Sequence, residues 1–126
     1  MAYVEASNFS LVSSESARVN RGVESKITLT LHQNFIGNLV DINILDDITI
    51  NVLNSLNTVV KTFKKSNNTL AYGTGINKGQ IYIVLTAAET KSLPEGSIHL
   101  DAIINLGIKE FNFPRLRLGQ TIDGGQ

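Results

Sequence analysis

The chain has 126 residues, the length of one ordinary domain, and its 11 basic and 11 acidic residues balance to a net charge of zero. The absence of cysteine excludes disulfide frameworks, thiolate metal sites and cysteine nucleophiles, and the charge balance gives no basic field for nucleic acid. The start, Met1 to Glu5, has neither the basic region nor the apolar run of a signal peptide, and no stretch approaches the ~20 apolar residues of a membrane span. We therefore expect a soluble protein made in the cytoplasm.

The first segment, residues 1–24, is polar and rich in serine. It predicts an N-terminal arm or edge strand outside the main domain. Three scattered apolar residues, Phe9, Leu11 and Val12, are the expected anchors of this arm on a partner, since an arm that orders on binding needs apolar side chains to bury.

Residues 25–118 are dominated by alternation with a period of two, as where Ile27, Leu29 and Leu31 alternate with threonines. Such alternation is typical of strands with one buried and one solvated face, and the branched side chains of Ile and Val suit a pleated surface. The pattern predicts an antiparallel all-β sandwich domain of about 7–9 strands. Strands are expected at 27–31, 39–44, 48–52, 58–63, 80–85, 98–104, 109–113 and 115–118.

One helical signal follows the strand at 80–85. Thr86 and Glu89 have the spacing of a capping box, in which the hydroxyl and the carboxylate each accept a bond from the other's backbone N–H. Pro94 and Gly96 then end any helix. The segment predicts one short helix or 3-10 turn near 86–92 that bridges two strands across the end of the sandwich. The glycine-rich residues 119–126 predict a flexible C-terminal tail.

Several apolar residues lie where alternation would turn them away from the core. Tyr82 and Val84 belong to a strand that is apolar on both faces, and Phe111 and Phe113 extend an apolar run towards the C-terminus. A second sheet that covers these side chains is the favoured interpretation for most of them. Any that stay exposed would mark an interface, as would the anchors of the arm.

Two sequence features match sites of chemistry only in part. Gly73–Gly79 resembles a phosphate loop, but its last spacing is one residue too long for G-x-G-x-x-G, and a strand follows where a helix is needed. Asp41, Asp46 and Asp47 could gather around calcium, or they mark a solvated turn at a strand end. We expect no metal and no cofactor.

The remaining candidates for chemistry are two histidines and one basic cluster. Neither His32 nor His99 lies in a recognisable motif, so we expect surface histidines and no catalytic site. Lysines at 61, 64 and 65 surround Phe63 and could bind single-stranded nucleic acid, but edge-strand lysines commonly block unwanted strand pairing. We expect the chain not to be an enzyme.

The sequence from Gly79 to Thr90, followed by Leu93–Gly96 and the strand to Ile103, resembles small Ig-like modules of tailed bacteriophages. In these modules a strand leads into an LTAAET…LP-G linker and then into another strand. The resemblance extends over about residues 25–118 and implies an Ig-like β-sandwich.

The same resemblance implies a virion structural role without enzymatic activity. The chain would be a connecting or decorating subunit, that is, a head decoration or cement protein or a component of the baseplate or tail. Its partners would be other virion proteins and copies of itself, with neither nucleic acid nor membrane. The alternative is a ligand- or carbohydrate-binding sandwich module that uses its end loops, Thr69–Lys78 and Asp41–Asp47.

Overall fold

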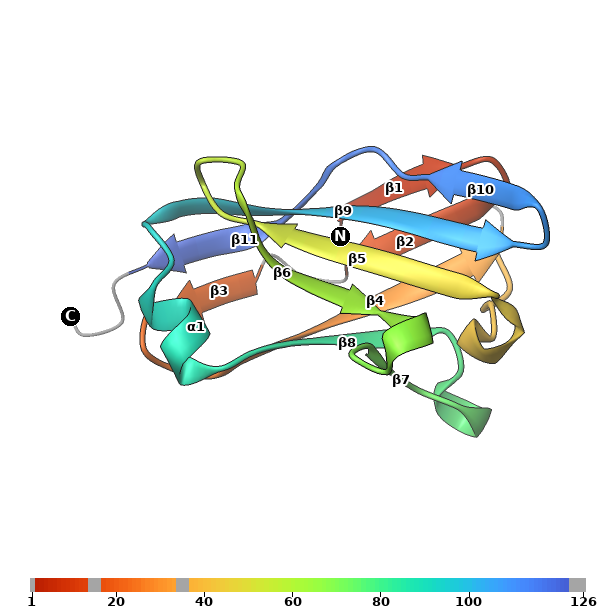
Figure 1. Ribbon diagram of the computed structural model, residues 1–126, viewed down its shortest axis with the longest axis horizontal. Helices are drawn as coiled ribbons and strands as arrows, with labels where there is room; N and C mark the ends of the chain where they lie inside the picture. Colours follow the sequence, from red (N-terminus) through yellow and green to blue (C-terminus); the bar gives the residue numbers. More distant parts are fainter. Residues whose placement is uncertain (1, 14–16, 34–36, 123–126) are drawn as a thin grey trace.

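The computed structural model describes residues 2–13, 17–33 and 37–122, which form two β-sheets packed face to face (Figure 1). The five-stranded sheet has the order β1 (Ala2–Ala6), β2 (Phe9–Ser13), β4 (Ser25–Gln33), β8 (Gln80–Leu85) and β7 (Ala71–Tyr72). The six-stranded sheet has the order β3 (Ala17–Asn20), β11 (Leu116–Ile122), β9 (Gly96–Leu106), β5 (Asp47–Leu53) and β6 (Val59–Lys64), with β10 (Lys109–Asn112) also paired to β9.

The strand order is that of an immunoglobulin-like sandwich. One sheet places β2, β4, β8 and β7 in the order A-B-E-D, and the other places β5, β9 and the β10–β11 pair in the order C-F-G. All strand pairs are antiparallel except β3 and β11, which are parallel. The prediction of an all-β, Ig-like sandwich is confirmed.

The core lies between the sheets and is built by alternation along the central strands. In β9 the residues at 98, 100, 102 and 104 are buried, and their neighbours at 99, 101 and 103 are only partly buried. β8 follows the same rule, with Ile81, Ile83 and Leu85 inside. Because successive side chains point to opposite faces, each strand contributes one row to a single continuous core.

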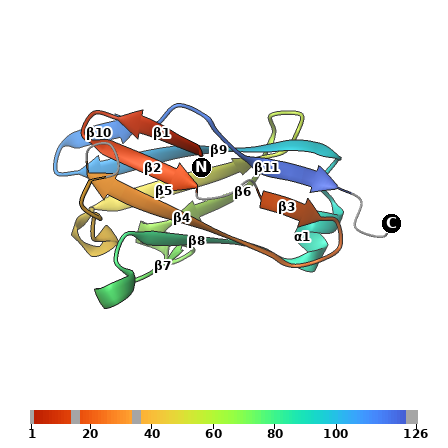
Figure 2. The ribbon, with the colours of Figure 1, turned by 180° about the vertical axis from the view of Figure 1, so that it is seen from behind.

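The N-terminal segment is built into both sheets and does not form an arm. β1 and β2 make a hairpin, β2 pairs with β4 through its other edge, and β3 crosses to the second sheet beside β11 (Figure 2). β1 and β3 each lie at the edge of a sheet, and all five residues of β2 are buried. Two serines of β2, Ser10 and Ser13, are among these buried residues, which is why a polar composition concealed a core strand.

The C-terminal segment also differs from its prediction. Residues 119–122 belong to β11, and residues 123–126 lie outside the described part of the chain. Pro114 separates β10 from β11 because proline has no N–H to donate to the ladder with β9. The three N-terminal strands and β7 are additions to the expected set, and with them the described strands number eleven, above the expected 7–9.

The predicted strand at 39–44 is instead a 3-10 helix, η1 (Ile42–Ile44), because the Asp41 carboxylate accepts the Asn43 N–H and starts a tight turn. Two further 3-10 helices are η2 (Lys65–Asn67) and η3 (Gly75–Asn77). None of the helices in the described residues is long and apolar enough to cross a membrane.

The predicted short helix is present as α1 (Ala87–Lys91), and its capping box is complete. The Thr86 hydroxyl accepts the Glu89 N–H at 3.2 Å, and the Glu89 carboxylate accepts the Thr86 N–H at 2.8 Å. The helix closes the end of the sandwich at which β3 turns into β4 (Figure 1).

Candidate functional site

Three connections of the sandwich meet at one end of the molecule, on the right in Figure 1. They are the connection between β4 and β5, described over residues 37–46, the β7–β8 connection at 73–79 and the β9–β10 turn at 107–108. We call these described residues the loop end. In Ig-like domains such loops cluster because alternate strand connections leave the sandwich at the same end.

Each of these connections carries an exposed isoleucine. Ile44 on η1 is 61% exposed, Ile76 on η3 is 98% exposed, and Ile108 in the β9–β10 turn is fully exposed. Isolated apolar residues on a surface are ordinary, whereas an exposed apolar side chain on each of three connections at one end of the sandwich favours an interaction surface there. The loop end is therefore the strongest candidate site in the described residues.

A groove of about 310 Å³ lies at the same end, between Phe9 at the start of β2 and the β4–β5 and β7–β8 connections. Its walls are mainly apolar, and one carboxylate and one ammonium group also line it. The lining side chains are Phe9, Gln33, Leu39, Val40, Asp41, Ile44, Lys78 and Leu106.

Hydrogen bonds between connections fix the loop end. The Asp46 N–H donates to the Asn105 carbonyl at 3.0 Å, and the Asp46 carboxylate accepts the Gly107 N–H, so the β4–β5 connection is tied to the β9–β10 turn. From the other sheet, the Tyr72 hydroxyl donates to Asn43 Oδ1 at 2.9 Å. The loop tips are held as one framework.

The three aspartates considered as calcium ligands each have a different backbone partner. Asp41 caps η1, Asp46 holds Gly107, and Asp47 accepts the Ile48 N–H at 2.9 Å. No group of three or more metal-ligating His, Asp or Glu side chains occurs in the part of the chain that the structure describes. These carboxylates shape the turn at the start of β5.

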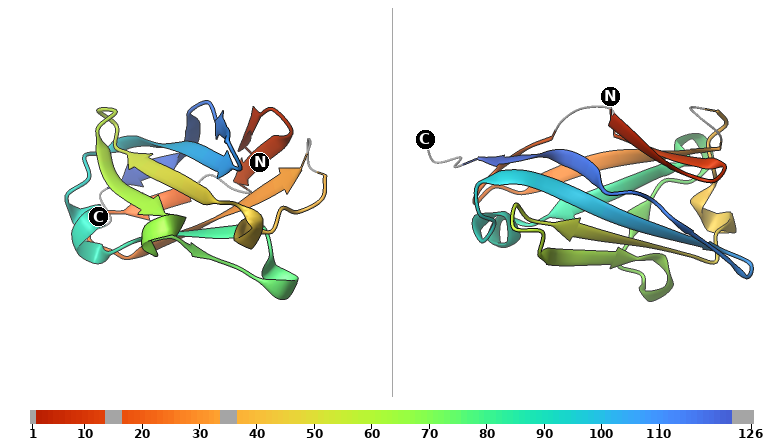
Figure 3. Two further views of the ribbon diagram at one scale, coloured as in Figure 1. Left: turned by 45° about the vertical axis from the view of Figure 1, so that its right-hand side comes forward. Right: turned by 90° about the horizontal axis from the view of Figure 1, so that it is seen from above.

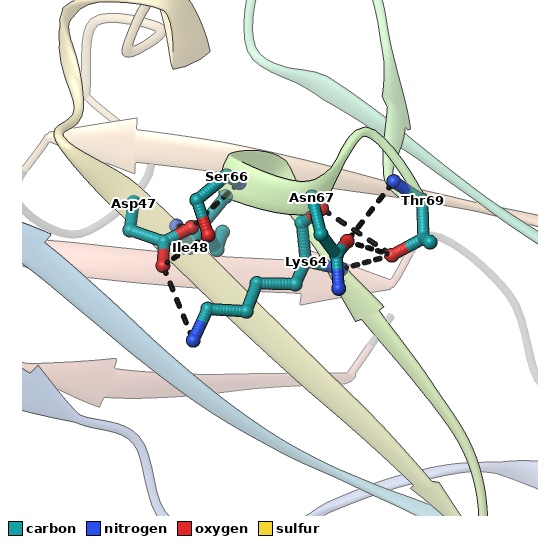
Figure 4. A network of polar contacts seen from close by, with 6 residues as sticks. All are labelled: Asp47, Ile48, Lys64, Ser66, Asn67 and Thr69. Atoms are coloured by element: carbon teal, nitrogen blue, oxygen red, sulfur yellow. Dashed lines mark hydrogen bonds and ion pairs between the residues drawn. The ribbon is translucent and has the colours of Figure 1, made fainter.

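Figure 4 shows the network around Asp47. Its carboxylate accepts bonds from the Ser66 N–H and hydroxyl, both at 3.0 Å, and lies 3.6 Å from the Lys64 ammonium. Burial raises the pKa of Asp47, but the bonds from Ser66 and Ile48 and the nearby Lys64 outweigh it, so the pKa lies below its ordinary value. The carboxylate holds η2 against the start of β5.

The basic cluster is also used within the fold. The Lys61 ammonium donates to Glu89 Oε1 at 2.7 Å and to the Val84 carbonyl at 3.0 Å, and it thereby links β6 to β8 and α1 across the open side of the sandwich. Lys64 faces Asp47, and Lys65 donates to the carbonyls of Asn43 and Leu45. Each of the three ammonium groups thus has a protein partner within the fold.

The histidines lie in different sheets. His32 is on β4 and its Nδ1 lies 2.9 Å from the Gly37 carbonyl, whereas His99 occupies the outward-facing row of β9. The glycine-rich loop at 73–79 forms η3 and leads into β8, so it lacks the following α-helix of a phosphate loop.

The three expected arm anchors are core residues, which corrects their interpretation as free docking groups. Leu11 is fully buried and Val12 is nearly so, and both lie in a strand that pairs with β1 and β4. Phe9 is buried except where it lines the groove, and its ring meets that of Phe111 edge-on at 5.0 Å.

The other expected interface residues divide between the surface and the core. Tyr82 and Val84 are half-buried on the outer face of β8, and the Lys26 ammonium lies 4.8 Å from the centre of the Tyr82 ring. Phe111 is half-buried on β10, whereas Phe113 is buried in the core. None of these residues belongs to the loop end.

The loop-end isoleucines were not among the predicted interface residues. A usable signal was present, because Ile76 and Ile108 each directly follow a glycine in a turn-forming stretch, where a large apolar side chain contributes nothing to a strand. Ile44 gave no such signal, since it ended a stretch that alternates like a strand.

Comparison of the chain with models of protein families, with curated proteins and with solved structures found no match.

Proposed function

We propose that this chain is a non-enzymatic structural protein of a bacteriophage particle, a connecting or decorating subunit that acts through protein–protein contacts. The observation that carries the proposal is the segment from Gly79 to Ile103. Its sequence resembles that of phage Ig-like modules, and it folds as strand, capped helix and strand, with β8 and β9 in the interior of the two sheets.

The loop end supports the protein-contact part of the proposal. Ile44, Ile76 and Ile108 present apolar surface on a framework that hydrogen bonds already hold in place. A preordered surface loses less conformational entropy on binding than an arm that must order. Contacts with other virion proteins or with copies of the chain therefore belong to this end of the sandwich.

The test is mass spectrometry of particles from the virus that encodes the chain, purified by density-gradient centrifugation. The chain should band with the particles at a constant ratio to a known coat protein through successive purifications. If it is abundant in the lysate and absent from the banded particles, the virion proposal is wrong.

A second candidate, ligand binding by the end loops, is supported by the groove, because Asp41, Ile44 and Lys78 of those loops line it. The only ring in its walls is that of Phe9, so the groove suits an aliphatic group better than a sugar. Thermal melts with a panel of oligosaccharides, and with calcium, test this candidate, since a ligand of the folded state raises the melting temperature.

A further inference from the structure

The loop end carries both protruding apolar groups and a hollow that could receive them. Ile76 and Ile108 project into solvent, and a groove lined by Lys78 and Leu106, each two residues away from one of them along the chain, has about 310 Å³ of space. For comparison, a cavity of roughly 150 Å³ in a protein core holds a benzene molecule. The groove is thus large enough for an aliphatic side chain.

The charges in the groove are also complementary to each other. Asp41 and Lys78 line the same hollow and carry opposite signs. Asp41 bonds the Asn43 N–H, and Lys78 has no ion pair with any described residue. A surface with one acid, one base, apolar protrusions and an apolar hollow can match a copy of itself. In a two-fold contact, if the base of one copy meets the acid of the other, the acid of the first copy also meets the base of the second.

We propose that the loop end is a self-association surface, at which two copies of this chain meet end to end about a two-fold axis. Ile76 and Ile108 of one copy lie against the groove of the other, and Lys78 of each copy pairs with Asp41 of its partner. Net neutrality removes long-range repulsion between the copies. This inference does not rest on the virion proposal.

The contact is small, because only three loop tips and one groove take part (Figure 3). We expect it to bury less than the ~800 Å² per partner of a standard interface, and therefore to form a weak dimer. Many copies held side by side would strengthen it, since linked contacts raise the effective concentration.

Sedimentation equilibrium of the purified chain over a wide concentration range tests the proposal. Wild type should show a monomer–dimer equilibrium, and Ile76→Ser and Ile108→Ser should each raise the dissociation constant by roughly ten- to a hundredfold. Leu56→Ser is the matched control, because Leu56 is also highly exposed but lies in the β5–β6 turn at the opposite end. It should leave the dissociation constant unchanged.

Charge reversal tests the orientation. Asp41→Lys and Lys78→Asp should each weaken self-association, because each places like charges opposite one another twice. An equimolar mixture of the two variants should restore dimers, since the mixed dimer has an acid opposite a base at both positions. Circular dichroism melts confirm that each variant is folded, because Asp41→Lys also removes the cap of η1.

Three results would overturn the proposal. The first is a wild-type chain that stays monomeric at every concentration. The second is a dimer that Leu56→Ser weakens and the loop-end variants do not. The third is a monomer that binds vesicles of anionic phospholipid through Ile76 and Ile108, which would assign the loop end to a lipid surface.

Discussion

Thr90 is the polar side chain on which the α1 end of the sandwich most depends, and Thr90→Val is the sharpest test of that role. Its hydroxyl is fully buried, donates to the Val23 carbonyl at 2.9 Å and accepts the Gly22 N–H at 3.0 Å. It thus joins α1 to the turn between β3 and β4. Valine keeps the shape of threonine but lacks these bonds, together with the contact of the hydroxyl with the Ala87 carbonyl at 3.1 Å.

The expected loss follows from the two backbone groups left without a partner. A buried group that loses its partner costs about 1–3 kcal/mol, and water reaches part of this turn because Gly22 and Val23 are exposed. We therefore expect Thr90→Val to lower the free energy of unfolding by about 2 kcal/mol. For a domain of this size, that loss corresponds to a fall in melting temperature of roughly 8 °C.

Urea denaturation followed by circular dichroism measures this loss. Thr90→Ser is the control, because it keeps the hydroxyl and removes one buried methyl group, which costs about 1 kcal/mol. The reasoning is refuted if Thr90→Val is as stable as wild type, or if Thr90→Ser loses more stability than Thr90→Val.

Three further predictions address the core, a backbone position and an acid. Leu11→Ala should cost about 2–5 kcal/mol in denaturation, because Leu11 is fully buried; a loss under ~1 kcal/mol would contradict its place in the core. Gly96→Ala should lower the melting temperature more than Gly22→Ala. Both glycines have positive φ (+129° at Gly96 and +84° at Gly22), but only at Gly96 would the added methyl group lie 2.6 Å from Ser55 Cβ. Equal losses in the two variants would refute the importance of this contact. Because the pKa of Asp47 is lowered from 3.8 in the folded chain, the contribution of its carboxylate to stability is complete above that value and is lost as the pH falls through the folded pKa. Asp47→Asn should therefore reduce the fall in the free energy of unfolding at acidic pH, measured by urea denaturation at a series of pH values. An unchanged fall would contradict this role of Asp47.

Local signals in the sequence carried the parts of the fold that were predicted correctly. The capping box of α1 needs only Thr86 and Glu89, which are three residues apart, and both of its bonds are present. Alternation likewise identified β9, whose inner row is set by the strand's own period of two. In these elements the deciding interaction lies within the element itself.

The failures occurred where distant residues decide the structure. β2 pairs with β1 and β4 and is buried along its whole length, and composition alone cannot show that Ser10 and Ser13 will lie inside. The stretch before β5 is an exception with a local cause, since it has the alternation of a strand but the Asp41 cap turns it into η1. The groove joins Phe9 to Lys78 and Leu106, and the chain gives no sign that these residues meet.

Asp46 and Asp47 connect the stability of the fold with the surface proposed for self-association. They are adjacent in sequence but bind opposite sides of the turn, since Asp46 holds Gly107 of the β9–β10 turn and Asp47 holds Ser66 of η2. Lys65 adds bonds to the backbone beside Ile44. A weak contact between loop tips gains most from such bracing, because less conformational freedom remains to be lost on association. The carboxylates that suggested calcium ligands in the sequence accept backbone N–H bonds in the structure, and these bonds hold the tips in fixed relative positions.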